Sequence, residues 1–479
     1  MLESNRGEPK EPTRVSRRGY RRKKIPKRFE EEPEPRPVPP GEGRPEEEQS
    51  PATELLDTEA PDPPREPVGF PSYTPLDPTK LSNVKTPVDP CGGASPSGVV
   101  AMTGNVYLAV SKDDGATFRY FDPTTMFPKF AGGIVGDQQI VYVPEVDVFV
   151  WIMLHNPVPA NNDGAFRLAM APAGDVASRP KSAWSYVDFV SSDFGIEGGF
   201  IDQPHLSYSN RNLIVAFDVS GNGRVVMRIP LSDLTGGQIR FEWIGPLTVG
   251  DSDYQFSAPA GNGPPGVFMA GHIDTGRLRV VRWHDGDASA SEHDVAVAKW
   301  SDSDDYSCST PSMVNWSGRC RSRISGATWR DGQLWLSWMS PRSAAGDRPQ
   351  YPQPYTRVVS IDPSAWTVIS ETQVWNSTFA FAYSALSINA NAEVAIAVAW
   401  GGATDEADAA FGILGDFVVW YRDGSTATPV DGDMGRWGDF LRTHRSTRTP
   451  AHLDGFGYFT NTDAGGAIVQ NPYHVRYGR

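Results

Sequence analysis

The chain has 479 residues, with 58 acidic and 44 basic side chains and a formal net charge of −14. This balance excludes a folded body that binds nucleic acid generally, because phosphate contacts need clustered Lys and Arg. No apolar run reaches the roughly 20 residues that cross a bilayer, so we expect no transmembrane segment. Frequent Trp, Tyr, Phe, Gly and Pro residues, without long heptad runs, favour strands and turns.

Residues 1–90 differ in composition from the rest of the chain. A basic block at residues 14–28 leads into a Glu/Pro tract at residues 30–49 that has almost no aliphatic side chains to bury. We therefore predict a disordered tail. The basic block either contacts an acidic surface, a lipid headgroup or nucleic acid, or pairs with the Glu tract; a solvated spacer is the simplest interpretation. The run Ser16 to Tyr20 has a twin-arginine form, but no apolar segment follows it, so we predict no signal peptide.

The first motif of the following region lies in the stretch NVYLAVSKDDGATFRY, residues 105–120. Its central part, Ser111 to Phe118, has the form S-x-D-x-G-x-T-F between two short strand-like runs. Gly115 suits the positive φ of a tight turn, and Ser111 and Asp113 can bond turn amides. Phe118 then returns to the core, so we predict a hairpin whose turn is fixed by its own side chains.

From about residue 91 onward, short strand-like runs alternate with Gly, Asp, Asn and Pro. These runs group into units of similar plan at residues 139–187, 205–243, 254–283, 325–359, 383–421 and 436–477. Such units are typical of propeller blades, because a four-stranded sheet buries its faces only against neighbouring blades. We predict an all-β fold at residues 91–479, a β-propeller of four-stranded blades. Six blades are favoured and seven are the alternative count, while two stacked β-sandwiches are the competing architecture.

The propeller ring is expected to close between the ends of this region. Both residues 107–120 and residues 437–477 are incomplete or irregular as blades. We therefore expect these N- and C-terminal stretches to combine in the closing blade.

Polar residues recur where the innermost strand of a unit is expected to begin, at residues 137–139, 202–205, 254–256 and 437–440. Innermost strands line the central channel of a propeller, so these side chains should converge on one rim. The candidate catalytic cluster at this channel mouth consists of Asp137, Asp202, His205, Tyr383, Asp439 and Arg442. The alternative role for such residues is to cap loops or to pin adjacent blades.

The Ser111–Phe118 motif resembles the Asp box of sialidases and related β-propellers. The region as a whole is similar to a group of uncharacterised bacterial propeller proteins, notably at residues 104–107, 137–138, 399–402 and 436–439. This similarity implies a fold and an extracellular or cell-surface location, but no activity. The sialidase resemblance implies an arginine clamp for a carboxylate and a Tyr nucleophile activated by a Glu. Arg323 and Arg442 are candidates for the clamp and Tyr383 for the nucleophile, whereas no third arginine is assigned and Glu393 is expected to point elsewhere.

No metal or cofactor is predicted. His155, His205, His272 and His284 show no H-E-x-x-H or other compact metal spacing, and no P-loop, G-x-S-x-G or dinucleotide fingerprint occurs. The three cysteines are too few for a disulfide framework. Cys308 and Cys320 bracket a loop in which a disulfide is sterically easy, and two free thiols are the equal alternative.

Two functions follow from these observations. The favoured one is a non-catalytic binding or scaffolding propeller that recognises a glycan or protein ligand on one rim. Trp283, Trp316, Trp329 and Trp437 would either stack on sugar rings or pack between blades. The alternative is a glycan-active enzyme, a sialidase-like hydrolase or a polysaccharide lyase, which uses the channel-mouth cluster. The second function requires the carboxyl groups of that cluster to gather at one place.

Overall fold

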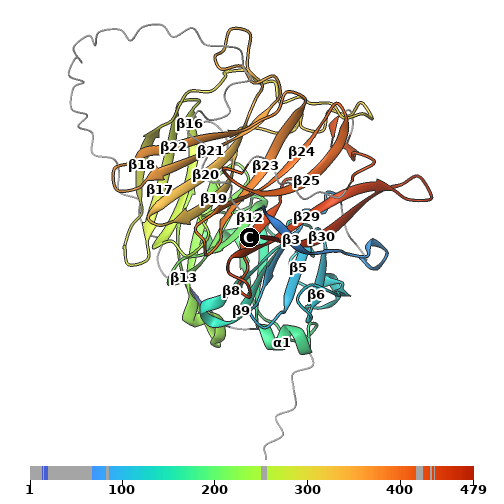
Figure 1. The fold of residues 1–479 in the computed structure, drawn as a ribbon. Coiled ribbons are helices and arrows are strands. Elements are labelled where there is room, and N and C mark those ends of the chain that lie inside the picture. The colour runs from blue at the N-terminus through green and yellow to red at the C-terminus, as the bar shows by residue number, and fades with distance from the viewer. Residues whose placement is uncertain are drawn as a thin grey trace, which may run out of the picture.

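The computed structural model describes residues 13–14, 16–19, 67–81, 86–249, 256–416, 424–431, 434–435 and 437–479. These residues form an all-β propeller whose seven sheets surround a central channel (Figure 1). The predicted fold class is confirmed, and the number of blades is the alternative count of seven.

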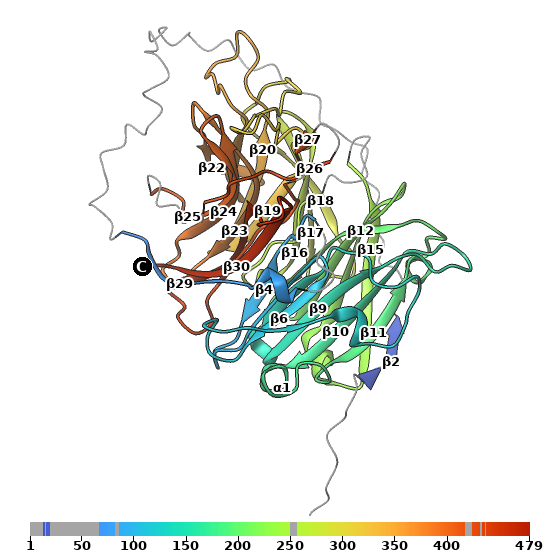
Figure 2. The same cartoon turned by 90° about the vertical axis from the view of Figure 1, so that its right-hand side faces the viewer.

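The blades are antiparallel sheets whose strands follow one another outward from the channel (Figure 2). Blade 1 contains β4 (Cys91–Ala94), β5 (Val100–Gly104), β6 (Tyr107–Ser111) and β7 (Arg119–Phe121). Blade 2 contains β8 (Gln139–Val143), β9 (Val148–His155), β10 (Ala165–Pro172) and β11 (Ser185–Val190). Blade 3 contains β12 (Ile201–Tyr208), β13 (Asn212–Val219), β14 (Gly223–Pro230) and β15 (Gln238–Leu247).

Blades 4 to 6 continue the ring. Blade 4 contains β16 (Gly266–Asp274), β17 (Arg277–His284) and β18 (Ser291–Ala296), and the segment 256–261 bonds to the channel side of β16. Blade 5 contains β19 (Ile324–Arg330), β20 (Gln333–Ser340), β21 (Tyr355–Asp362) and β22 (Thr367–Val374). Blade 6 contains β23 (Phe379–Ile388), β24 (Val394–Gly402) and β25 (Asp405–Ile413). The strand expected at residues 416–421 lies, apart from its first residue, outside the described residues.

Blade 7 closes the ring by joining the C-terminal strands to a strand from the N-terminal region. It contains β28 (Arg442–Arg445), β29 (His452–Thr462), β30 (Ile468–Gly478) and β3 (Gly69–Pro75). Strand β3 runs antiparallel to β30, with Ser72 opposite Arg476 (Figure 1). The prediction of closure by N- and C-terminal strands is therefore correct, but the expected partners are wrong. Residues 107–121 complete blade 1 and do not combine with residues 437–477.

Blade 1 escaped recognition in the sequence because its inner strand is built from small residues. Gly92 lies directly against blade 7, where a Cβ atom on it would stand 2.2 Å from Cε1 of the Phe456 ring. Because this close approach requires glycine, β4 lacks the large apolar side chains that mark the other strands.

The remaining elements are short. The α-helix α1 (Ala173–Ser178) and the 3₁₀ turns η1 (Pro78–Lys80), η2 (Pro123–Thr125), η3 (Pro144–Val146), η4 (Ser191–Phe194) and η5 (Leu231–Thr235) connect strands, and β26 (Val430–Asp431) pairs with β27 (Met434–Gly435). Strands β1 (Thr13–Arg14) and β2 (Ser16–Gly19) run parallel to β11 and β15 at the outer edges of blades 2 and 3. Most of the predicted tail, including the Glu/Pro tract, lies outside the described residues. No helix in the described part of the chain is long and apolar enough to cross a membrane.

Aromatic and aliphatic side chains fill the spaces between blades. Phe166 of blade 2 packs against Phe217 of blade 3, with 5.0 Å between ring centroids. Charges buried in the blades are paired: Arg224 donates Nε and Nη2 to the two carboxylate oxygens of Asp218 at 2.8 and 2.6 Å. Arg167 holds Asp188 in the same bidentate way, at 2.6 and 3.0 Å. These contacts make a rigid ring that holds the starts of the inner strands in fixed positions.

The predicted turn at residues 111–118 has the geometry that its sequence indicates. Gly115 has a φ of +84°, and its N–H donates to Oγ of Ser111 at 2.9 Å. Asp113 accepts hydrogen bonds from the backbone N–H of Thr117 at 2.9 Å and from Oγ of Ser111 at 2.7 Å. The turn joins β6 to β7, which places it at the end of the propeller opposite the starts of the inner strands.

Candidate functional site

Left-handed backbone recurs at or just before the start of the inner strands. Asp89, Asp137, Gln203 and Tyr383, from blades 1, 2, 3 and 6, have φ values of +42°, +42°, +49° and +52°. Non-glycine residues in this region cost about 1 kcal/mol or more each, so they persist only where the surrounding structure requires them. Register shifts accompany two of them, between Asp202 and His205 in β12 and between Ala382 and Ala385 in β23. This repeated bend turns polar side chains into the channel mouth, the end of the channel at which the inner strands begin.

The carboxyl groups of Asp89, Asp137, Asp202 and Asp439 gather at the channel mouth. The Asp137 and Asp202 side chains are in hydrogen-bonding contact. Burial first, and then the charges of Asp202 and Asp89, raise the pKa of Asp137 well above its ordinary value. Both side chains keep part of their surface exposed, and Asp439 is exposed. The mouth therefore holds a carboxyl group, that of Asp137, that keeps its proton to a higher pH than an ordinary aspartic acid does, near the exposed side chain of Asp439.

A hydrogen-bond network fixes these groups across three blades. The buried carboxylate of Asp89 accepts the backbone N–H of Asp439 at 3.0 Å and Nδ2 of Asn105 at 3.0 Å. Oδ1 of the same Asn105 accepts the backbone N–H of Asp137 at 2.5 Å. Asp89 and Asn105 thus connect blade 7 to blade 2 through blade 1. Neither residue was a predicted site residue, because Asp89 precedes a strand that was not recognised.

Arginines line the other side of the channel mouth. Arg319, Arg323, Cys320, Tyr383 and Asp439 surround a cavity of about 90 Å³, and an adjoining cavity of about 240 Å³ is bounded by Arg319, Tyr383 and Asp439. Nη1 of Arg323 donates to Oε1 of Gln203 at 2.7 Å. Of these arginines, only Arg323 was predicted. The run R-C-R-S-R at residues 319–323, just before β19, is the signal in the sequence that identifies Arg319.

Tyr383 lies at the channel mouth, but its surroundings oppose a nucleophilic role. Burial, followed by the charges of Cys320 and Asp439, raises the pKa of its phenol well above the ordinary value. An activated tyrosine nucleophile needs the opposite shift. Glu393, as expected, points elsewhere: it is paired with Arg479 and accepts Nδ2 of Asn389 at 2.6 Å. Tyr383 and Glu393 are therefore not arranged as a tyrosine nucleophile with its activating glutamate.

His205 and Arg442 lie one layer deeper than the carboxyl groups. Nη2 of Arg442 contacts Nδ1 of His205 at 3.0 Å and donates to Oε1 of Gln139. Burial lowers the pKa of His205 well below its ordinary value, so its imidazole is neutral. The structure thus divides the predicted cluster: Asp137, Asp202, Tyr383 and Asp439 lie at the mouth, whereas His205 and Arg442 form a polar layer beneath it.

The other candidate residues have structural positions. Trp283, Trp316 and Trp437 are fully buried and pack between strands, so they offer no platform to a sugar ring, and Trp329 is partly buried against Phe268. The thiols of Cys308 and Cys320 are both free, which decides the open question of a disulfide. Within the described ranges, no three His, Cys, Asp or Glu side chains are grouped as a metal site would require. His155 and His272 are buried, which lowers the pKa of the two imidazoles to about 4 and about 3.

Comparison with known proteins finds only distant structural likenesses and gives no function. No protein-family model and no curated protein matches the chain. Among solved structures, a protein of unknown function from Dyadobacter fermentans is 10% identical, with a TM-score of 0.40, over 86% of this chain and 99% of its own. The GH93 α-L-arabinofuranosidase of Fusarium graminearum is 12% identical, with a TM-score of 0.39, over 82% of this chain and 95% of its own. The NanB sialidase of Streptococcus pneumoniae is 9% identical, with a TM-score of 0.38, over 65% of this chain and 64% of its own.

All three likenesses are at low identity and low TM-score, and neither fold nor activity is taken from them. The fold assignment rests on the strand pairings of this chain. The chain is a seven-bladed β-propeller with acidic and basic side chains at its channel mouth.

Proposed function

We propose that the channel mouth is the active site of a glycan-active hydrolase. The observation that carries this proposal is the gathering of Asp137, Asp202 and Asp439: burial first, and then the neighbouring carboxyl groups, raise the pKa of Asp137 well above its ordinary value, while Asp439 is exposed nearby. Hydrolysis of a glycosidic bond needs one carboxylic acid to protonate the leaving oxygen and a second carboxylate to act as base or nucleophile. An environment that separates the pKa values of neighbouring carboxyl groups assigns these two roles.

In the proposed reaction, Asp137 donates its proton to the glycosidic oxygen as the bond to the sugar carbon breaks. Asp439 then has one of two roles. As a base, it takes a proton from the water that attacks the sugar carbon, and solvent returns a proton to Asp137. As a nucleophile, it forms an ester with the sugar carbon, and water hydrolyses this ester while Asp137 takes the proton of that water. Asp202 is a positioning residue that favours the protonated form of Asp137. Arg319 and Arg323 supply donors for hydroxyl or carboxylate oxygens of the substrate.

The binding-module alternative has less support. Three of its four candidate sugar-stacking tryptophans are buried in packing contacts, and a gathering of carboxyl groups that raises the pKa of Asp137 is not needed for simple recognition. A binding module therefore becomes one outcome of the test.

The experiment incubates the full chain with neutral, sialylated and uronic-acid glycans and separates the products. We expect sugar release that Asp137→Asn lowers by about 10²- to 10⁴-fold, since general acid catalysis contributes that much. The rate should also fall as pH rises and Asp137 loses its proton. Asp331→Asn is the matched control, because Asp331 is an exposed carboxylate in the β19–β20 turn whose φ of +46° asparagine tolerates. Unsaturated uronate among the products would identify a lyase instead, and saturable glycan binding without turnover would overturn the enzyme proposal.

A further inference from the structure

Arg442 is a cation without a counter-ion in the part of the chain that the structure describes. Its contacts are to Oε1 of Gln139, to Nδ1 of His205 and to the thiol of Cys91. The amide is neutral, burial keeps His205 unprotonated, and burial raises the pKa of the Cys91 thiol. Arg442 is partly buried, and a charge withdrawn from water among neutral groups is stabilised when a partner of opposite sign is available. The guanidinium therefore favours an anion that the protein itself does not provide.

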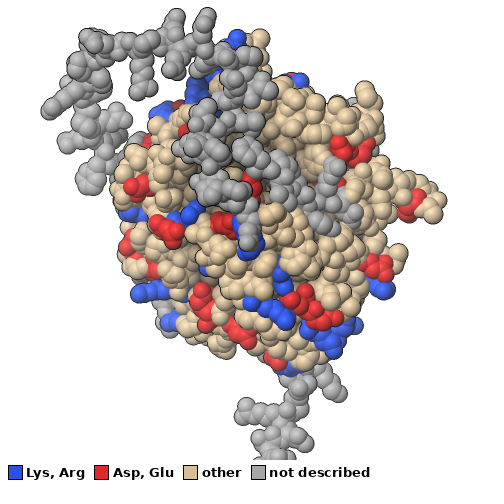
Figure 3. Space-filling view, in the orientation of Figure 1, with Lys and Arg blue, Asp and Glu red and all other residues tan. Residues whose placement is uncertain are grey.

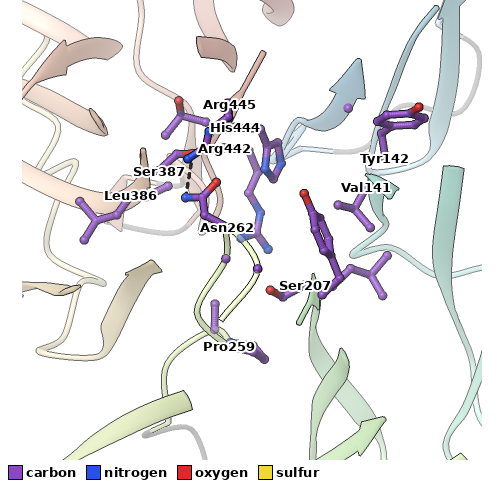
Figure 4. A pocket seen from close by; sticks show the side chains of 18 of the residues that line it. Val141, Tyr142, Ser207, Pro259, Asn262, Leu386, Ser387, Arg442, His444 and Arg445 are labelled. Atoms are coloured by element: carbon purple, nitrogen blue, oxygen red, sulfur yellow. Dashed lines mark hydrogen bonds between the residues drawn. The ribbon is translucent and has the colours of Figure 1, made fainter. Parts of the chain in front are cut away.

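Arg442 borders a second cavity of about 280 Å³, which we call the rear cavity. Inner strands or their flanking segments from all seven blades line it, so it lies on the channel axis. Ser207, Asn262 and Arg442 reach it from blades 3, 4 and 7 (Figure 4). The residues of the rear cavity come from later positions in the inner strands than Asp137 and Asp202 do. The rear cavity and the cavity of about 90 Å³ at the channel mouth have one lining residue in common, Ser325.

Further polar groups at the rear cavity need a ligand partner. His444 lines it, and Nε2 of its ring is buried with no hydrogen-bond partner. Burial, and next the charge of Arg442, lower the pKa of His444 to about 4, so the ring is neutral at physiological pH. Arg445, which is exposed at the edge of the cavity, donates Nε to the carbonyl of Ile388 at 3.0 Å and forms no ion pair with a described carboxylate.

Acidic groups are scarce around the cavity. Glu145 is its one acidic lining residue among the described residues, and it is exposed. On the face of the molecule shown in Figure 3, by contrast, basic and acidic side chains are interspersed. The excess of positive charge is therefore a property of this cavity.

We propose that the rear cavity binds a small oxyanion, a carboxylate or phosphate, carried by a molecule of about the size of a monosaccharide. Arg442 would take the anionic oxygens in a charge-assisted hydrogen bond, while His444, Asn262 and Ser207 would face the hydroxyl groups. The size follows from the cavity volume, which lies just below the range of pockets for drug-sized ligands. This site does not depend on the proposed hydrolase, because it shares neither Asp137 nor Asp439.

Isothermal titration of the full chain tests the proposal with four probes: glucuronate, glucose 6-phosphate, inorganic phosphate and neutral glucose. We expect saturable binding of the charged sugars and none of glucose. Glucuronate against glucose 6-phosphate distinguishes the carboxylate from the phosphate, and inorganic phosphate alone tests whether the sugar part contributes. Arg442→Gln should weaken binding by about tenfold or more, since hydrogen bonds to charged groups contribute at least that much.

The control variant is Arg277→Gln, which removes the same charge from an exposed ion pair on blade 4 and should leave binding unchanged. If Arg442→Gln does not fold, the test uses Arg445→Gln at the cavity edge, which should weaken the binding of the charged sugars by a few fold. The proposal is wrong if glucose binds as well as the charged sugars, if no probe binds, or if Arg277→Gln weakens binding as much as the cavity variant.

Discussion

Arginines buried within the blades are paired with carboxylates, whereas Asp137 and Arg442 on the channel axis have no partner of opposite charge among the described residues. In blade 3, Arg224 and Asp218 are almost completely buried and satisfy each other through two hydrogen bonds. On the axis, Asp137 lies against Asp202, which carries the same kind of group, and Arg442 lies among neutral partners. Paired charges stabilise the ring, whereas unpaired or like charges cost stability and are retained where a ligand can use them.

This difference separates polar groups that stabilise the fold from polar groups that can bind a ligand, and it needs no comparison with another protein. A bidentate arginine and carboxylate leave nothing for a substrate to bind. A protonated acid beside a carboxylate, or a cation without an anion, can still form hydrogen bonds or charge pairs with a bound molecule. Both ends of the channel have this property, and the blade interiors that we have described do not.

The largest expected effect is on the structural side of this comparison. Asp218→Ala should destabilise the fold by about 3–5 kcal/mol, because it leaves the buried Arg224 guanidinium without its partner. The unfolding free energy in urea measures the loss. Asp175→Ala is the matched control: it breaks an ion pair in which the carboxylate is 37% exposed, and it should cost no more than about 1 kcal/mol. Equal losses in the two variants would contradict the distinction.

A smaller effect of opposite sign is expected at the mouth, where Asp137→Asn should stabilise the protein at neutral pH by about 0.5–2 kcal/mol. The pKa of Asp137 is raised from 3.8 in the folded state, so the folded chain holds its proton more tightly than the unfolded chain does. Wild-type stability therefore falls as pH rises from about 4 through the raised pKa. The stability of Asp137→Asn should not fall with pH in this way, because asparagine does not titrate.

Melting temperatures of both proteins at acidic and neutral pH measure this difference. Their gap should close at acidic pH, where Asp137 is protonated whether the chain is folded or unfolded. Asp202→Asn should behave similarly, because it removes the neighbouring charge. A variant that is less stable than wild type at pH 7 would show that the contact between Asp137 and Asp202 is a structural pair.

The fold was largely predictable because its signals are local and repeated. Recurring strand units indicated blades, and the residues of the turn at Ser111 to Phe118 determine their own hydrogen bonds. The missing blade and the closing strand were not predictable by the same means. Gly92 and its small neighbours give β4 little strand signal, and β3 pairs with β30 across nearly the whole length of the chain.

The sequence predicted several residues of the candidate site, but not how far along the channel each side chain lies. Strand starts indicated that Asp137, Asp202 and Asp439 face the channel, and in the structure these three side chains lie near one another. The register shift between Asp202 and His205 decides that the first lies at the mouth and the second beneath it, and no sequence pattern shows such a shift. The separation of Arg442 from the carboxyl groups likewise depends on which layer of the ring its strand reaches.

The smallest expected effect concerns Asp113, a charge that belongs to neither class because it is exposed and bonded only within its own turn. Asp113→Ala removes the hydrogen bonds that the carboxylate accepts from Oγ1 of Thr117, from the N–H of Thr117 at 2.9 Å and from Oγ of Ser111 at 2.7 Å. The cost should be about 0.5–1 kcal/mol of folding free energy, since exposed hydrogen bonds contribute little. These hydrogen bonds, led by that from the Thr117 side chain, lower the pKa of Asp113 from 3.8, so its contribution is present above that pH and is lost as pH falls through the lowered pKa.

Urea unfolding at neutral and acidic pH measures this effect, with Lys112→Ala as the control because Lys112 is exposed in the same turn and forms none of these bonds. Turnover at the channel mouth and oxyanion binding in the rear cavity should be unchanged in Asp113→Ala. The turn lies beyond the end of β6, on the outer part of blade 1, and lines neither the mouth nor the rear cavity. A change in either activity would mean that the far turn is coupled to the axis, and that local bonding in a blade cannot be separated from the function of the channel.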